Sequence, residues 1–257
     1  FVFINNELGF KAPNVKALCS TGKSTKANRK QKYTGEKGIG SKSVFKVSDC
    51  PHIHSGGFHF KFDLKGEHNF RYLAPIWIPS DNQAQGTKIV LPVSTLEEAR
   101  EAFNDSREEL NSEILLFLRR VKRLEIHEAN SQSREVFTRS DEPVSDNNDV
   151  RFVELTENDN ERTYYVRDQL VDMEDIEEEK RAELADTNIV IAFPLDEEGS
   201  ADLSRDRSLY SFLPIKRGPF KFILQADFVL TLNREDILEG KKWNQRIRDK
   251  IPKTLVK

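Results

Sequence analysis

The sequence predicts an α+β fold divided into two parts. Three observations support this prediction: strand patterns occur along the whole chain, helical patterns lie between them, and charge is unevenly distributed. Although 40 basic and 43 acidic residues leave a net charge of -3, basic side chains gather in one early segment and acidic ones in a late segment. We therefore expect residues 1–104 to form one domain and residues 105–257 a second.

Strand patterns are the clearest signal of secondary structure. Aromatic and polar residues alternate over Phe58–Phe62, which is the period of a half-buried strand, so its three phenylalanines are interpreted as core side chains. The other predicted strands are Phe1–Ile4, Thr87–Leu91, Val150–Leu155, Thr163–Val166, Ile189–Phe193 and Phe220–Leu232.

Helical patterns are interspersed with these strands. Ser94 followed by Glu97 forms a capping box in front of an apolar helical period. A second helical pattern covers residues 108–118, and the apolar residues after Gly40 predict a helix that begins there. The polar stretch 129–149 is rich in turn residues and is predicted to be an exposed loop.

Composition limits the classes of function. No run approaches the roughly 18 apolar residues of a membrane-spanning helix, so we expect a soluble chain without a membrane partner. Two cysteines, Cys19 and Cys50, are too few for a disulfide framework, which favours the cytoplasm or the nucleus. The acidic run Glu177–Glu179 is interpreted as a solvated helix face or an insert without chemistry. Because the sequence begins at Phe1, partway through a predicted strand, we expect it to be a fragment that lacks upstream residues.

A glycine and lysine cluster near the start is the strongest functional signal. The segment from Lys11 to Lys46 contains ten basic residues and a single acidic residue, Glu36. Closely spaced glycines let the backbone approach phosphates, and a helix N-terminus after Gly40 would add free amides. A polyphosphate ligand is predicted, and the alternative is a glycine-rich turn with solvated lysines.

Two common phosphate motifs do not fit this cluster. A Walker loop would need glycine at position 17, where the sequence has Ala17 ahead of Gly22 and Lys23. A dinucleotide fingerprint starting at Gly38 would need a preceding strand and a glycine at position 43, which is Ser43.

Several separated segments, in the same order, resemble the histidine kinase-like ATPase domain of the sacsin and NO VEIN family. The segments are residues 5–10, 17–19, 24–26, 35–45, 86–89, 192–195, 211–214, 220–228 and 233–244. This family belongs to the superfamily of gyrase, the ninety-kilodalton heat-shock chaperone and histidine kinases. The resemblance implies an N-terminally truncated Bergerat sandwich in residues 1–104. It implies a second α/β module, similar to the chaperone middle segment, in residues 105–257.

The resemblance also assigns residue roles. Asn5 stands where the superfamily has an acidic residue that reads the adenine amino group, Gly9 closes that motif, and Thr87 matches a threonine near the base. The implied phosphate contacts are Lys23, Ser24, Thr25 and Lys26 in the lid, and Gly35, Lys37, Gly38, Ile39 and Gly40 in the second glycine motif. Asn5, Glu7 and Ser41 depart from the family pattern. Because asparagine brings no charge, reduced nucleotide affinity is expected.

Arg234 is the implied catalytic residue. The segment 233–235 resembles an Arg-Glu loop of the chaperone whose arginine reaches the terminal phosphate. A guanidinium suits this role because its fixed fork neutralises charge on a transferring phosphoryl group. The alternative is a surface arginine paired with Glu235 or Asp236. ATP and Mg²⁺ are the implied cofactors, and the general base and the Mg²⁺ ligand would lie upstream of Phe1.

The resemblance implies a chaperone-like ATPase in the intact protein, in which ATP closes a lid and the second module. The alternative is a nucleotide-gated or structural scaffold without hydrolysis, and neither reading identifies the protein clients. No metal site is predicted at Cys50, His52 and His54, because a second ligand pair is missing. Nucleic acid is not expected as a partner, because no aromatic residue interrupts the basic stretch 23–32.

Overall fold

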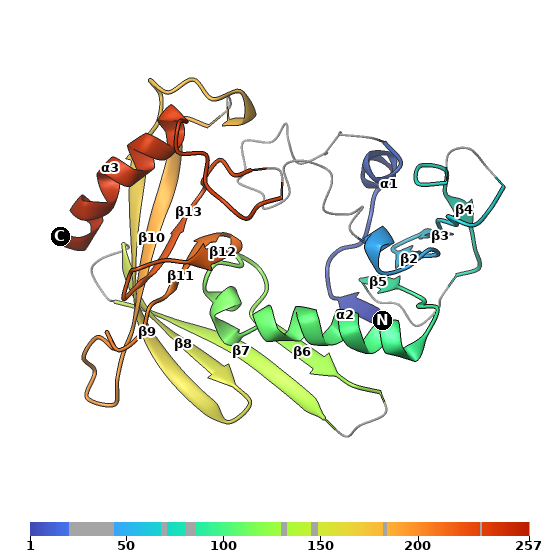
Figure 1. Cartoon of the computed structure of the whole chain (residues 1–257), viewed down its shortest axis with the longest axis horizontal. Helices are drawn as coiled ribbons and strands as arrows, with labels where there is room; N and C mark the ends of the chain where they lie inside the picture. Colours follow the sequence, from blue (N-terminus) through green and yellow to red (C-terminus); the bar gives the residue numbers. More distant parts are fainter. Residues whose placement is uncertain are drawn as a thin grey trace. The chain divides into compact units, whose positions relative to one another are not determined.

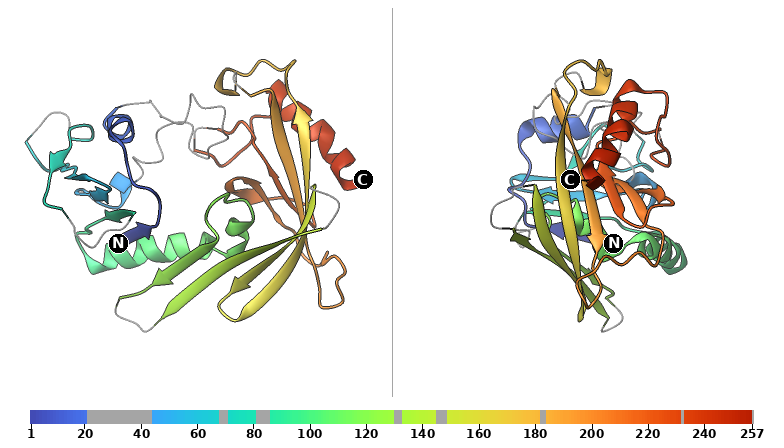
Figure 2. Two further views of the ribbon diagram at one scale, coloured as in Figure 1. Left: turned by 180° about the vertical axis from the view of Figure 1, so that it is seen from behind. Right: turned by 90° about the vertical axis from the view of Figure 1, so that its left-hand side faces the viewer.

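The computed structural model describes residues 1–20, 44–67, 71–80, 86–129, 133–144, 149–181, 184–231 and 233–256. They form two compact units, Phe1–Glu109 and Leu110–Lys257 (Figures 1 and 2). The predicted boundary at residues 104 and 105 falls inside helix α2 (Leu96–Glu109). The α+β class is confirmed, with more sheet than helix.

Unit 1 contains a five-stranded antiparallel sheet in the order β1-β5-β2-β3-β4. Its elements are β1 (Val2–Asn5), α1 (Ala12–Leu18), β2 (His52–Ser55), β3 (Phe58–Lys61), β4 (Ile76–Trp77), β5 (Thr87–Val90) and α2. Val15 of α1 packs on Ile53, Phe60 and Phe62 in the core of this unit. The core role predicted for the phenylalanines is confirmed for Phe60 and Phe62, while Phe58 is partly buried.

Two helix predictions in unit 1 need correction. Helix α2 exists, but Thr95 caps it in place of Ser94: Thr95 Oγ1 accepts a hydrogen bond from Glu98 N at 3.2 Å. The helix expected after Gly40 is a single 3₁₀ turn at residues 44–46 within the described part of the chain. There, Val44 O accepts from Val47 N at 3.1 Å.

The helical pattern at residues 108–118 is also interrupted. Helix α2 ends at Glu109, and a separate 3₁₀-helix, η2 (Ser112–Leu116), follows. Asn111 caps η2, because its Oδ1 accepts a hydrogen bond from Glu113 N at 2.9 Å. Such a local side-chain bond competes with helix continuation, so the apolar period persists while the helix breaks.

Unit 2 is built on an eight-stranded sheet in the order β12-β11-β13-β10-β9-β8-β7-β6. The strands are β6 (Arg123–His127), β7 (Arg134–Pro143), β8 (Val150–Glu157), β9 (Asn160–Asp172), β10 (Asp186–Pro194), β11 (Ser208–Ser211), β12 (Leu213–Arg217) and β13 (Ile223–Ala226). Neighbouring strands are antiparallel, and among the described pairs β11 and β13 are the exception.

The α/β module expected for residues 105–257 differs in detail from the structure, in which the sheet is mostly antiparallel and the helices are few. Besides η2, the helices described in unit 2 are η3 (Glu179–Arg181) and α3 (Lys242–Val256). Most strands follow one another directly along the chain, as Figure 1 shows for β6 to β9. Antiparallel neighbours need only short connections, so this sheet forms without the crossover helices of an α/β unit.

The central strand β10 of unit 2 is buried on both faces. In β10, Val190 and Ala192 contribute to one core cluster and Ile189 and Ile191 to another, as the alternation along a strand requires. Residues of η2 belong to the first cluster, and the fully buried Trp243 of α3 belongs to the second.

Three other predictions about unit 2 are corrected. The stretch 129–149 contains the ten-residue strand β7, whose Phe137 is fully buried. In the acidic run, Glu178 is buried, and its Oε2 lies 3.1 Å from Lys241 Nζ. The predicted strand Phe220–Leu232 is shorter, since β13 covers Ile223–Ala226.

None of the helices in the described ranges is long and apolar enough to span a membrane.

Candidate nucleotide-binding site

The ends of β1 and β5 bring two predicted site residues together. Asn5 and Thr87 are cross-strand partners in the antiparallel pair. Thr87 is buried, whereas Asn5 is exposed where β1 ends. The sheet therefore places the residue implied to read the base next to the threonine implied to lie near it.

A hydroxyl pair fixes Thr87 from its other side. Ser55 of β2 is the second cross-strand partner of Thr87, and the Ser55 Oγ and Thr87 Oγ1 atoms are hydrogen-bonded to each other. Ser55 Oγ also accepts a hydrogen bond from Phe10 N at 2.8 Å. Both side chains are buried, so the pair ties β2, β5 and the segment after Gly9 into one arrangement.

Gly9 has a structural reason to be glycine. Its φ is +83°, and a Cβ built there would lie 2.9 Å from Gly56 N. Side chains rarely adopt this backbone region, and here one would also collide with the β2–β3 hairpin. The turn that leaves β1 therefore contacts the end of β2, next to Ser55.

Asn5 keeps hydrogen-bonding capacity for a ligand. Its Oδ1 accepts one bond, from Glu7 N at 3.2 Å, and a carbonyl oxygen has two lone pairs. Within the described part of the chain, its Nδ2 makes no hydrogen bond. A neutral amide here can thus both accept from an amino group and donate to a ring nitrogen. Glu7 itself is exposed in the turn after β1.

The implied phosphate contacts lie outside the described residues. They are Lys23, Ser24, Thr25 and Lys26 of the lid, and Gly35, Lys37, Gly38, Ile39 and Gly40 of the second glycine motif. These assignments stay predictions.

Arg234 lies in unit 2 and, among the described residues, does not make the surface ion pair that was the alternative to a catalytic role. It is partly buried with φ +65°, and its Nη2 donates to Ser211 O at 2.9 Å. The pairing expected for a surface arginine is replaced: Glu235 accepts from Asn233, and Asp236 pairs with Lys216 at 2.6 Å. Its role at a terminal phosphate stays a prediction.

Cys50 and the neighbouring histidines form two separate pairs. Cys50 Sγ lies 3.6 Å from His52 Nε2, whereas His54 Nδ1 lies 3.2 Å from His59 Nδ1. Burial and the neighbouring Lys61 lower the pKa of His52. Across the described ranges, no three histidine, cysteine or acidic side chains form a group that could hold a metal ion.

Three important residues were not predicted from the sequence. Ser55 and Gly56 support the site from β2 and the following turn, and the Ser-Gly-Gly triplet was a detectable hairpin signal. Asn244 of α3 holds the loop that carries Arg234, through bonds to Val229 and Leu238. No local pattern marks Asn244.

The similarity to known proteins covers both units. No protein-family profile matches the chain. Protein NO VEIN of Arabidopsis thaliana is 34% identical over 274 residues, an alignment that includes 98% of this chain. This similarity supports a relationship of the chain to Protein NO VEIN. The chain spans 10% of the length of Protein NO VEIN, so the match concerns one segment of a much longer protein.

In the part of the site that the structure describes, three contacts hold the residues together. Asn5 lies opposite Thr87, Thr87 is bonded to Ser55, and Gly9 packs against Gly56. These contacts combine an exposed amide at Asn5 with a rigid, buried support at Thr87 and Ser55.

Proposed function

We propose that this chain carries the base-binding part of an ATP site and that the intact NO VEIN-like protein is a chaperone-like ATPase. The observation that supports this most is the register of β1 and β5. Asn5 and Thr87, which come from two motifs far apart in the sequence, are direct cross-strand partners.

The chemistry of the site follows from Asn5. Its Oδ1 has a free lone pair to accept a hydrogen bond from the adenine amino group. Thr87 cannot shift easily, because Ser55 holds its hydroxyl inside the sheet. A preorganised contact of this kind loses little entropy when the base binds.

The triphosphate would extend toward the lysines of residues 23–26 and the glycines of residues 35–40. Mg²⁺ would supply charge neutralisation between the phosphates. In the proposed cycle, Arg234 exchanges its bond to Ser211 O for the terminal phosphate. That exchange replaces a neutral acceptor with an anionic one, which strengthens the hydrogen bond.

Asn5→Asp tests the base contact. The carboxylate still accepts from Glu7 N, and its bond to the adenine amino group becomes charge-assisted, so ATP affinity should rise about tenfold. Asn5→Ala should abolish detectable binding. Asn6→Asp is the matched control, because it adds the same charge one position further along the exposed turn and should leave the affinity unchanged.

Calorimetric titration with ATP and Mg²⁺ measures these affinities. The proposal is wrong if wild-type protein and all three variants fail to bind ATP at millimolar concentration. Equal affinities for Asn5→Asp, Asn5→Ala and Asn6→Asp would show that ATP binds elsewhere.

A scaffold without hydrolysis is the second candidate function. The amide at position 5 and Glu7 in a glycine position favour it, because both depart from the pattern of active family members. Arg234→Gln separates the two candidates in the full-length protein. For an ATPase, it should leave ATP affinity unchanged and slow phosphate release at least about tenfold. The exposed Arg120→Gln serves as control, and a scaffold would release no phosphate in any variant.

A further inference from the structure

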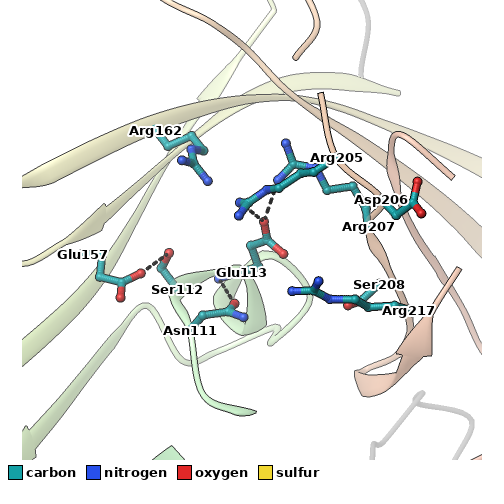
Figure 3. A pocket seen from close by; sticks show the side chains of 10 residues that line it. All are labelled: Asn111, Ser112, Glu113, Glu157, Arg162, Arg205, Asp206, Arg207, Ser208 and Arg217. Carbon is teal, nitrogen blue, oxygen red and sulfur yellow. Dashed lines mark hydrogen bonds and ion pairs between the residues drawn. The ribbon is translucent and has the colours of Figure 1, made fainter. Parts of the chain in front are cut away.

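Unit 2 contains a cavity of about 310 Å³ that is rich in arginine. Arg162 of β9, Arg217 of β12, and Arg205 and Arg207 from the segment before β11 line it around Glu113 of η2 (Figure 3). All these residues belong to unit 2, so the cavity is formed within one compact body.

Glu113 cannot satisfy the cationic groups that surround it. Its side chain is largely buried, and three donors contact the same oxygen, Oε1. Arg207 Nη1 lies 3.4 Å from it, Arg205 Nη2 lies 3.8 Å away, and Tyr164 Oη lies 3.3 Å away. Charge-assisted bonds are normally shorter, about 2.8 Å, so this carboxylate is shared among weak contacts.

The other carboxylates of the lining are already engaged. Asp206 pairs with Lys221 at 2.9 Å, and Glu157 accepts from Ser112 Oγ at 3.2 Å. Among the residues that the structure describes, Arg162 and Arg217 make no ion pair. Guanidinium donors therefore exceed the acceptors available to them inside the cavity.

Arg207 sets the shape of the cavity. It is 2% exposed, and its Nη2 donates to Asp202 at 2.7 Å, which anchors the preceding loop. Its buried Nε has no hydrogen-bond partner among the described groups. Burial and the nearby Glu113 raise the pKa of Tyr164, which keeps its hydroxyl as a donor to Glu113. We regard Arg207 and Tyr164 as positioning residues.

We infer that this cavity binds a phosphate-bearing small molecule through Arg162, Arg205 and Arg217. The three guanidinium groups come from different segments and are the more exposed ones of the lining. Arginine forks match phosphate oxygens in bidentate geometry, and the volume lies at the lower end of the range for small-ligand sites. This site is independent of the ATP site proposed in unit 1.

Titration with inorganic pyrophosphate tests the inference. Wild-type protein should bind it, while Arg162→Gln and Arg217→Gln should each weaken binding about tenfold, since each removes a charge-assisted contact. Arg120→Gln removes the same charge from an exposed position outside the cavity and should bind as wild type does. Phosphate and a phosphate monoester, tested in parallel, distinguish a free anion from an esterified ligand.

Arginine modification gives a second readout that needs no variant. Pyrophosphate should protect Arg205 and Arg217 from a dicarbonyl reagent, as read by mass spectrometry, and should leave Arg120 equally reactive.

Three outcomes would overturn the inference. They are no binding of any phosphate probe at millimolar concentration, equal binding by Arg162→Gln, Arg217→Gln and wild type, and protection of Arg120 to the same extent as Arg217. Asn5→Ala should not change pyrophosphate binding at this cavity, so failure of the ATP proposal and failure of this one are distinguishable.

Discussion

Gly86 and Gly199 show how the surroundings of one residue decide the effect of a mutation. Both have positive φ, +85° and +79°. A Cβ at Gly86 would overlap Asn5 O, whereas no atom lies within 4 Å of a Cβ at Gly199. Gly199→Ala should therefore cost about 1–2 kcal/mol of backbone strain. Gly86→Ala should cost more than about 3 kcal/mol, because β1 must also move away from β5.

Chemical unfolding of the two variants, followed by circular dichroism, measures this difference. Equal losses of unfolding free energy would contradict the close approach of Gly86 to Asn5.

The lowered pKa of Asp202 predicts a contribution to folding stability that is lost in acid. Hydrogen bonds from Ser204, and then the contact with Arg207, lower the pKa of Asp202 from its ordinary value of 3.8 to about 2. The unfolded chain therefore takes up the proton first, so the stabilisation is present above pH 3.8 and is lost as the pH falls toward about 2. Asp202→Asn should flatten this part of the pH profile of unfolding. An unchanged profile in urea titrations would refute the assignment.

At the residue scale, sequence motifs mark some residues that the structure places next to one another, whereas their role in binding stays a prediction. Asn5, Gly9 and Thr87 were selected from family-like motifs, and the structure pairs Asn5 with Thr87 and places Gly9 against Gly56. Ser55 and Arg207 were missed, because their importance depends on partners distant in the sequence. A serine or arginine in isolation gives no sign of such partners.

At the scale of elements, Asn244 connects α3 to the loop that carries Arg234. Its Oδ1 accepts from Val229 N, and its Nδ2 donates to Val229 O and Leu238 O, each at 2.8 Å. Asn244→Ala leaves the buried Val229 N without its hydrogen-bond partner, while Val229 O and Leu238 O each keep one main-chain bond, so the loss should cost about 1–3 kcal/mol. Amide exchange across residues 229–238 should accelerate by about tenfold or more, as measured by mass spectrometry.

The adjacent Gln245→Ala is the matched control for this prediction. Gln245 makes one side-chain bond, to Glu239 O at 3.3 Å, and its loss should leave exchange in the loop nearly unchanged. Similar exchange in both variants would contradict the role of Asn244.

In unit 2, the strands with clear apolar alternation were predicted best. The central strands β8, β9 and β10 have clear apolar alternation and were each detected in part. The edge strands β6 and β12 were missed, because they carry charged residues and, in β12, Pro214. Edge strands commonly carry such residues because they discourage pairing with other chains, and this makes them resemble loops in sequence.

At the scale of the whole molecule, unit 2 should fold by itself. Its two core clusters contain residues from Leu110 to Ile251, and all of them lie within Leu110–Lys257. A protein of residues 110–257 should therefore unfold cooperatively and retain pyrophosphate binding. Thermal unfolding followed by near-ultraviolet circular dichroism checks this. Loss of the signal of the buried Trp243 at room temperature would show that residues 1–109 are required.

The overall class was predictable because helical and strand periods differ along the sequence. The architecture of unit 2 was not predictable from the sequence. In β7, for example, the single fully buried side chain, Phe137, stands among mostly polar residues. On the same face of β7 as Phe137, Arg139 Nη1 donates hydrogen bonds to Leu115 O at 2.7 Å and to Leu116 O at 2.8 Å. Because these partners lie 24 and 23 residues earlier in the sequence, the sequence of β7 alone resembles a loop.

Nuclear magnetic resonance during an ATP titration tests the central claim most directly. If the base lies against the end of β1 and β5, the side-chain amide of Asn5 and the main-chain amides of Asn5 and Thr87 should shift, and adenosine should reproduce these shifts. Shifts confined to unit 2, or their absence at Asn5 and Thr87 while ATP is bound, would contradict a nucleotide site in this sheet.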